Sequence, residues 1–221
     1  MERLSSNALD YDDLVTAVYK KTKDLILNND LQPGKKLRQE ELARSLGVSR
    51  TPIIKALHLL VTDNLIAYTP RRGFTVKELS TREMAEIFYV RSLLDGAVAR
   101  EAAVKANPDA LAELDSYFAG FAPPWTTEKT VQYMRNDRLF HARLYDIGDV
   151  PLLCRMNEMF NISRVSYQRG LLRDPSETLA EHLALTDAVK NRDAELAERL
   201  ARAHAMRSRA RLLSELDEAE E

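Results

Sequence analysis

The sequence contains a single cysteine, Cys154, so no disulfide can form within the chain, and this fits a reducing compartment such as the cytoplasm. No apolar run approaches the length needed to cross a bilayer, and residues 1–10 lack the apolar core of a signal peptide. Glycine is scarce, at seven residues in 221. β-Branched runs are few after the first third of the chain. These absences predict a cytoplasmic protein with a mainly helical fold.

Charge is distributed unevenly along the chain, although the net charge is only −2. Residues 1–79 carry 13 basic and 10 acidic side chains, whereas residues 80–221 carry 19 and 24. The basic surplus lies within residues 31–77, which contain nine basic and three acidic side chains. Such a patch can neutralise nucleic-acid phosphates, although a merely solvated basic surface has the same composition.

Apolar residues at helical spacing predict three helices in the first third of the chain, over about 12–29, over about 39–46 and after Ser49. Gly47 is expected to end the second helix as a C-terminal cap. The Ser49 hydroxyl is expected to cap the third helix by accepting a backbone N–H. Two helices joined by so short a turn are typical of a helix-turn-helix, whose second helix enters the major groove of DNA.

A hairpin is predicted directly after these helices, because residues 65–69 and 73–77 alternate like two short strands. Its tip is the basic run Pro70-Arg71-Arg72. Three helices followed by a basic hairpin are typical of a winged helix-turn-helix, with a two-stranded wing. The alternative from the pattern alone is a small helical core with an incidental hairpin.

The rest of the chain shows helical patterns only. Ser80-Thr81-Arg82-Glu83 has the form of a capping box and begins a long helix. Five more helices are expected, one from Asn107-Pro108 and the others over about 127–147, 151–170, 177–191 and 193–218. The fold is therefore predicted to be mainly α, with a winged helix-turn-helix followed by an all-α bundle of six or seven helices.

Short motifs in the first domain resemble the DNA-binding domain of GntR-family regulators. In chain order they are Leu31-Gln-Pro-Gly-Lys-Lys-Leu37, Glu41-Leu-Ala, Leu46-Gly-Val-Ser-Arg-Thr-Pro52, Ala56-Leu57 and Gly73-Phe74-x-Val76. The second domain resembles the FCD subclass of that family in Arg91, Asp137-x-x-x-His141, Glu181-His182, Asp193 and His204. Together the two patterns extend over nearly the whole chain.

Two positions depart from the GntR pattern. The family usually continues after Ser-Arg-Thr-Pro with a hydrophobic residue, arginine and glutamate, where this chain has Ile53, Ile54 and Lys55. The cation is thus displaced by one residue, about 100° around the helix, so the base contact of the family's arginine cannot simply be transferred. Asn64 replaces a glycine before the wing, and asparagine tolerates a positive φ better than most residues.

The resemblance to GntR regulators implies that seven residues face DNA. They are Arg38, Ser49, Arg50, Thr51, Lys55, Arg71 and Arg72. Arg50, near the start of the recognition helix, can donate two hydrogen bonds to guanine O6 and N7 or bind a phosphate. For Ser49 we expect the helix cap to be the main role of the hydroxyl.

Four residues are candidate metal ligands. Asp137 and His141 are four positions apart and share one helical face, while His182 and His204 lie on two other predicted helices. Spacing alone favours isolated structural histidines, but the resemblance to FCD domains implies that these four residues bind a divalent metal. Three imidazoles and one carboxylate suit Zn²⁺ first and Ni²⁺ or Mn²⁺ as alternatives, with positions left for water or an anionic ligand.

The same resemblance implies a pocket for a small organic acid beside the metal. Arg91 is the first candidate to bind its carboxylate, and a salt bridge to Asp95 at i+4 is the alternative. Asn161 and Arg164 are further candidates to line the pocket.

We therefore predict a DNA-binding domain over 8–78 and an effector-binding and dimerisation domain over 80–216. The expected protein is a homodimeric repressor that binds double-stranded DNA at a palindromic operator. It is not expected to be an enzyme. Two other functions stay open. A metal-dependent hydrolase could use Glu181, beside His182, as its base. An architectural DNA-binding protein would respond to neither metal nor metabolite.

Overall fold

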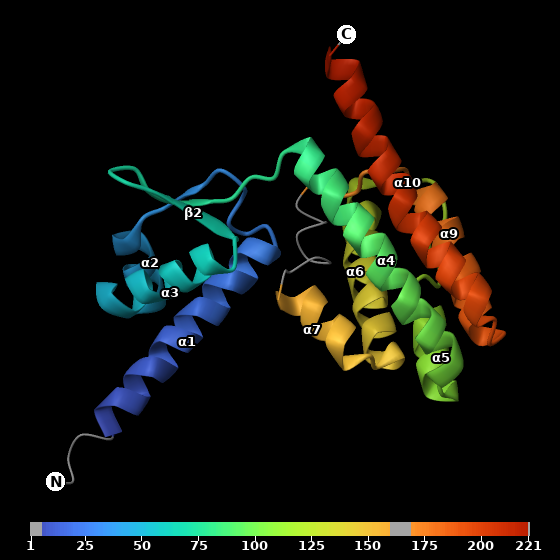
Figure 1. Ribbon diagram of the computed structural model, residues 1–221, viewed down its shortest axis with the longest axis horizontal. Coiled ribbons are helices and arrows are strands. Elements are labelled where there is room, and N and C mark those ends of the chain that lie inside the picture. The colour runs from blue at the N-terminus through green and yellow to red at the C-terminus, as the bar shows by residue number, and fades with distance from the viewer. Residues whose placement is uncertain (1–5, 160–168, 221) are drawn as a thin grey trace. The chain divides into compact units, whose positions relative to one another are not determined.

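The computed structural model describes residues 6–159 and 169–220, so Asn161 and Arg164 lie outside the described residues. The chain forms two compact units, Met1–Leu79 and Ser80–Glu221, and each is described by itself (Figure 1). The fold is mainly α, as predicted, with a small sheet in the first unit. Among the described helices, none combines the length and the hydropathy that a membrane crossing needs.

The first unit is a winged helix-turn-helix. Its elements are α1 (Ser6–Leu27), β1 (Lys36–Leu37), α2 (Gln39–Leu46), α3 (Arg50–Thr62), β2 (Ile66–Thr69) and β3 (Gly73–Val76). Helix α1 packs against α3, which buries Ile53, Ala56, Leu57 and Leu60. This buried stripe follows the helical period, so the opposite side of α3 is left for solvent.

The wing has one strand more than predicted. All pairs are antiparallel in the order β1-β3-β2, and Lys36 of β1 lies opposite Thr75 of β3. Phe74 and Val76 of β3 are buried, and Thr75 between them is partly exposed. A strand of two residues such as β1 is too short to show an alternating pattern, and for this reason the sequence did not indicate it.

Three turn residues test the local expectations. Gly47 has φ 67° and its N–H bonds back to α2, which confirms the C-terminal cap. Asn64 has φ 59°, the conformation that asparagine was expected to tolerate. Ser49 precedes α3 at the N-cap position, but its side chain makes no capping hydrogen bond, so the expected cap is wrong. Its exposed hydroxyl is not used by its own helix.

The second unit is a helical bundle. The described helices are α4 (Thr81–Lys105), α5 (Pro108–Ser116), α6 (Thr127–Gly148), α7 (Pro151–Met159), α9 (Pro175–Lys190) and α10 (Ala194–Glu220). The Ser80 hydroxyl accepts the Glu83 N–H while the Glu83 carboxylate accepts the Ser80 N–H, so the predicted capping box is confirmed. The helix expected over 151–170 is described only as far as Met159.

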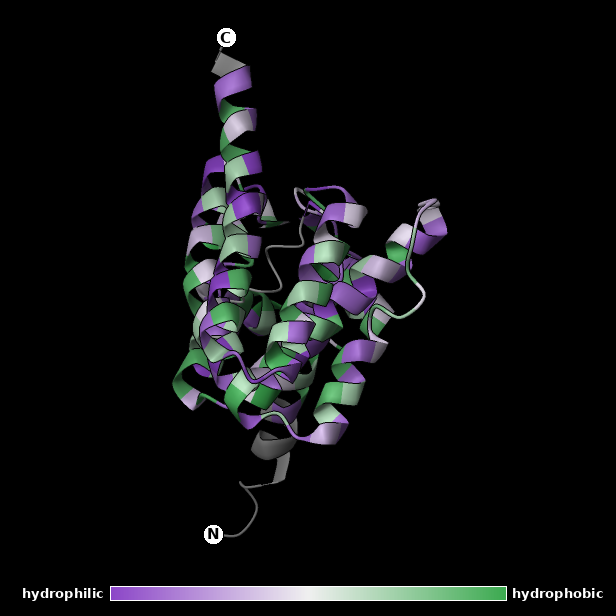
Figure 2. Ribbon diagram, turned by 90° about the vertical axis from the view of Figure 1, so that its right-hand side faces the viewer, coloured by the Kyte–Doolittle hydropathy of each residue, from purple (hydrophilic) through white to green (hydrophobic). Residues whose placement is uncertain are grey.

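Close helix contacts bring the bundle core together. Helices α4 and α10 lie side by side over much of their length (Figure 1). Gly96 of α4 allows this approach because it has no Cβ. A Cβ at this position would lie only 2.4 Å from Arg202 Cγ and 3.3 Å from the Glu198 carbonyl oxygen of α10. Hydrophilic and hydrophobic residues alternate along α10 (Figure 2). The buried residues of α10 include Ala197, Ala201, Ala205 and Leu212, so its apolar face packs inward. Polar residues within that core need a separate explanation.

Candidate functional site

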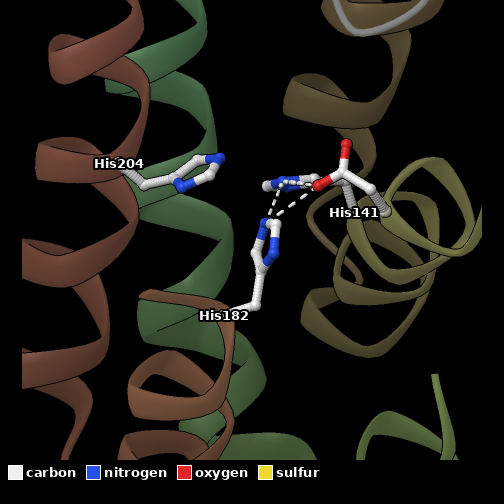
Figure 3. A group of neighbouring side chains, drawn as sticks. His141, His182 and His204 are labelled. Carbon is white, nitrogen blue, oxygen red and sulfur yellow. Dashed lines mark hydrogen bonds and ion pairs between the residues drawn. The ribbon is translucent and has the colours of Figure 1, made fainter. Parts of the chain in front are cut away.

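Four buried polar residues converge in the core of the second unit. They are the predicted set Asp137 and His141 on α6, His182 on α9 and His204 on α10. One ligand atom from each lies within 4.8 Å of all the others. Figure 3 shows the three imidazole rings directed from different helices towards a common centre. His182 has no exposed surface.

Local sequence explains how each side chain reaches the centre. Asp137 and His141 are one helical turn apart and project from the same face of α6. His182 lies on the buried face of α9, on the same side as Leu185. On α10, His204 continues the row of buried alanines that includes Ala201, and these small side chains let the helix lie close to the core.

The distances at the centre fit a single metal ion. His182 Nε2 lies 2.9 Å from Asp137 Oδ1 and 3.3 Å from His141 Nε2, and His141 Nε2 lies 3.8 Å from Asp137 Oδ1. Ligand atoms bound at about 2.0–2.2 Å to one ion are separated from each other by about 3–3.5 Å. The spacing of these three atoms is therefore close to that of ligands around one cation, and the His204 ligand atom lies within 4.8 Å of each of them.

Hydrogen bonds on the far side of His182 fix which ring nitrogen faces the centre. Tyr133 Oη donates to Thr178 Oγ1 at 2.8 Å, so the same oxygen is an acceptor for His182 Nδ1 at 2.9 Å. Burial raises the pKa of Tyr133, so the hydroxyl keeps its proton. His182 Nδ1 can therefore donate to Tyr133, and Nε2 is the ring nitrogen that faces Asp137 and His141.

His204 and His141 show the same orientation. His204 Nδ1 lies 2.7 Å from Glu181 Oε2, and a carboxylate only accepts, so the proton between them belongs to Nδ1. His141 Nδ1 lies 3.7 Å from Asp95 Oδ2, on the side away from Asp137. All three rings therefore turn Nδ1 towards an oxygen and Nε2 towards the centre.

The ionisation states suit metal binding. Burial lowers the pKa of His141 well below its usual value and lowers the pKa of His204 to about 4. Burial alone would raise the pKa of Asp137, but the adjacent His182 holds it below the usual range. Neutral imidazoles and an ionised carboxylate are the forms that bind metals. The 2.9 Å contact of His182 Nε2 with the Asp137 carboxylate, which only accepts, is a hydrogen bond that a bound metal ion would replace.

A pocket borders the centre and shares two of its residues. Its lining is formed by Phe88, Arg91, Asp137, Gly170, Leu171, Leu172, Arg173, Thr178, His204 and Ser208. Arg91 Nε donates to Asp95 Oδ2 at 2.8 Å and both side chains are buried, so the alternative salt bridge is present. Arg91 nevertheless contributes to the pocket wall, and the salt bridge fixes its position there.

Arg173 was missed at the sequence level. Its side chain is buried in the segment before α9, and it donates to both oxygens of Glu181 at 2.7 and 2.6 Å. The Glu181 carboxylate is thereby held by Arg173 and by His204, outside the ligand set. The sequence pointed to Glu181 because it directly precedes His182. Arg173 lies in an irregular segment, where hydrophobic periodicity gives no indication of a functional residue.

The seven residues predicted to face DNA are all exposed on the first unit. Arg50, Thr51 and Lys55 lie on α3, with Ser49 just before it, while Arg38 precedes α2. Arg71 and Arg72 form the turn between β2 and β3. Arg50 forms an ion pair with Glu40 of α2, and Arg38 forms one with Glu41 at 3.3 Å.

Known proteins share both units. The profile of the FCD domain matches residues 86–207, more than half of the chain, and the profile of the bacterial regulatory proteins of the gntR family matches residues 14–76. The HTH-type transcriptional regulator YdhC of Bacillus subtilis (strain 168) is 28% identical over 198 residues, which cover 84% of this chain and 85% of YdhC. The HTH-type transcriptional repressor RspR of Escherichia coli (strain K12) is 26% identical over 79% of this chain and 78% of RspR.

Solved structures agree with these matches. The structure of E. coli McbR/YncC superimposes with a TM-score of 0.71 and 25% sequence identity, over 92% of this chain and 98% of that one. The relatives are transcription regulators, and this is the class of protein that a winged helix-turn-helix followed by a helical ligand-binding domain indicates. The chain therefore belongs to the GntR family of bacterial transcription regulators, within the group whose members carry an FCD effector-binding domain.

Proposed function

We propose that this regulator binds one divalent cation at Asp137, His141, His182 and His204, and that the cation is part of its effector site. Zn²⁺ is the first candidate and Ni²⁺ or Mn²⁺ are the alternatives. The observation that carries the proposal is the convergence of three buried imidazoles on one buried carboxylate. Imidazole nitrogens and a carboxylate oxygen are the ligand atoms that such a cation prefers, and all four residues are buried.

The effector is proposed to be a small carboxylate. The pocket is bordered by Asp137 and His204 of the ligand set and by Arg91. Four protein ligands leave open positions on octahedral Ni²⁺ or Mn²⁺, and Zn²⁺ can expand from four to five ligands, so a carboxylate oxygen can bind in either case. Arg91 lines the same pocket, and its guanidinium, positioned by Asp95, can donate to an anion that the metal also attracts.

The DNA-binding surface is proposed to be formed by the exposed residues of α2, α3 and the wing. Arg38, Arg71 and Arg72 supply charge for phosphates, while Arg50 and Lys55 lie on the helix that reads the major groove. A single winged helix buries little DNA surface, so we propose a homodimer on a palindromic operator. RspR bears the name of a repressor, and repression is the proposed mode for this chain as well.

The geometry gives little support to a hydrolase. Glu181, the base that a hydrolase would use, receives hydrogen bonds from His204, Arg173 and Arg207. Burial acts to raise the pKa of Glu181, but the bonds from Arg173 and His204 hold that pKa well below the usual range. A carboxylate with a strongly lowered pKa is a poor proton acceptor at neutral pH. An architectural DNA-binding protein, in turn, has no use for an effector pocket next to four buried residues that can bind a metal.

Elemental analysis and operator binding test the proposal together. Purified protein is expected to contain about one equivalent of metal per chain, and His182→Ala and His204→Ala are expected to lose it. Operator affinity should change when metal and a panel of small carboxylates are added. The proposal is wrong if wild type and both variants retain equal metal, or if no metal or carboxylate changes DNA binding.

A further inference from the structure

Glu181 links the proposed metal centre to the segment in front of α9. It directly precedes His182 on α9, and its carboxylate reaches across to His204 on α10. The side chain is mostly buried, at 15% exposure, although it is not in the ligand set. A buried carboxylate outside the ligands needs a role of its own.

Each oxygen of Glu181 has defined donors. Oε2 accepts from His204 Nδ1 at 2.7 Å and from Arg173 Nη2 at 2.6 Å. Oε1 accepts from Arg173 Nη1 and from Arg207 Nη1, both at 2.7 Å. Two guanidinium groups therefore neutralise and orient the carboxylate, and the rigid fork of Arg173 fixes its plane.

This arrangement controls the direction of the His204 ring. An ionised carboxylate cannot donate, so a 2.7 Å contact places the proton on Nδ1 and leaves Nε2 with a lone pair. Ring rotation by half a turn would break the bond to Glu181. The carboxylate therefore selects both the tautomer and the rotamer in which His204 can bind a cation.

We propose that Glu181 is the positioning residue for His204, and that Arg173 holds Glu181 in place from the pocket wall. Arg173 lines the pocket, so the effector site and the His204 ligand share one hydrogen-bond chain. This inference rests on the proposed metal function. Removing an outer partner of a metal-binding histidine costs about 10–100-fold in metal affinity.

Two substitutions of Glu181 and one control test the inference. Glu181→Ala removes the acceptor. Glu181→Gln keeps the size but offers one acceptor oxygen to three donor groups. Glu177→Gln is the matched control, because Glu177 lies one turn earlier on α9, is 64% exposed and comes no closer than 3.9 Å to Arg173. Zn²⁺ affinity is measured on the full chain by competition with a chromophoric chelator.

The expected result is a loss of Zn²⁺ affinity of about 10–100-fold for Glu181→Ala, a smaller loss for Glu181→Gln and less than about twofold for Glu177→Gln. Long-range ¹H–¹⁵N NMR of the protein after metal removal by a chelator gives the second readout, the tautomer of the His204 ring. It should show His204 protonated at Nδ1 in wild type and in Glu177→Gln, and a shift of that proton towards Nε2 in Glu181→Ala.

The possible failures are distinguishable. If wild type does not bind Zn²⁺, Ni²⁺ or Mn²⁺, the metal proposal fails, while the NMR tautomer still decides whether Glu181 orients His204. If wild type binds metal and both Glu181 variants bind it within twofold, Glu181 is not a positioning residue. If Glu181→Ala does not fold, Glu181→Gln decides by the same two readouts, since it preserves the side-chain volume. An Nε2 proton on wild-type His204 overturns the inference directly.

Discussion

Removing the proposed cation should destabilise the FCD unit and leave the DNA-binding unit unchanged. The proposed ligands come from α6, α9 and α10, so a bound ion cross-links three helices of Ser80–Glu221. The unit Met1–Leu79 contains none of these ligands. Chelation should therefore lower the melting temperature of one unit only.

The size of the shift follows from linkage. A ligand that binds only the folded state at 100 times its dissociation constant stabilises that state by about 2.7 kcal/mol. The entropy of unfolding is about 2.1 cal/mol/K per residue, which gives roughly 0.3 kcal/mol/K for a unit of about 140 residues. Their ratio predicts that the chelated unit melts about 9 °C lower than the metal-loaded unit.

Differential scanning calorimetry with and without a chelator measures this shift. His182→Ala should melt at a temperature that a chelator no longer changes, because His182 is fully buried among the other ligands. His58→Ala is the control, since His58 is exposed on α3 in the other unit. Equal chelator-induced shifts in wild type and His182→Ala would refute the reasoning, as would a wild-type melt that a chelator does not move.

Three further predictions concern protonation and DNA reading. Once a chelator has removed the metal, His204 takes up a proton near pH 6.5 in the unfolded chain but only near pH 4 in the folded chain. The free energy of unfolding should therefore fall as the pH drops through this window, by on the order of 3 kcal/mol. Urea unfolding at several pH values checks it, and a flat profile contradicts it. Arg50→Ala should cost about 1–3 kcal/mol of operator binding in a gel-shift titration, and unchanged affinity would remove Arg50 from the site. The double change Ile54→Arg with Lys55→Glu should alter the operator selected from random DNA more than it alters stability, and identical selected motifs would count against it.

Local signals predicted the elements of this fold well. The capping box at Ser80, the left-handed cap at Gly47 and the positive φ of Asn64 are decided by neighbouring residues, and the structure shows all three as expected. The Ser49 cap failed because an N-cap serine can leave its hydroxyl to solvent when the backbone alone starts the helix. Strand β1 was missed because two residues carry no period.

The site depended on another kind of information. The convergence of Asp137, His141, His182 and His204 was predicted only through the resemblance to FCD domains, because spacing along the chain does not show which helix faces meet. Arg173 shows the limit of both approaches. It belongs to no repeated pattern and was not among the motif residues, yet its bond to Glu181 is one of the shortest in the bundle.

The Arg50–Glu40 ion pair affects how the loss of Arg50 should be read. Both side chains are more than half exposed, and exposed pairs contribute about 0–1 kcal/mol, so breaking the pair costs the free protein little. In Arg50→Ala, however, Glu40 remains beside the start of α3, where a DNA phosphate would repel it. A double-mutant cycle of Arg50→Ala with Glu40→Gln separates the two effects. If Arg50 contacts DNA directly, most of the loss persists in the Glu40→Gln background, whereas a loss that largely disappears there would assign Arg50 to the masking of Glu40.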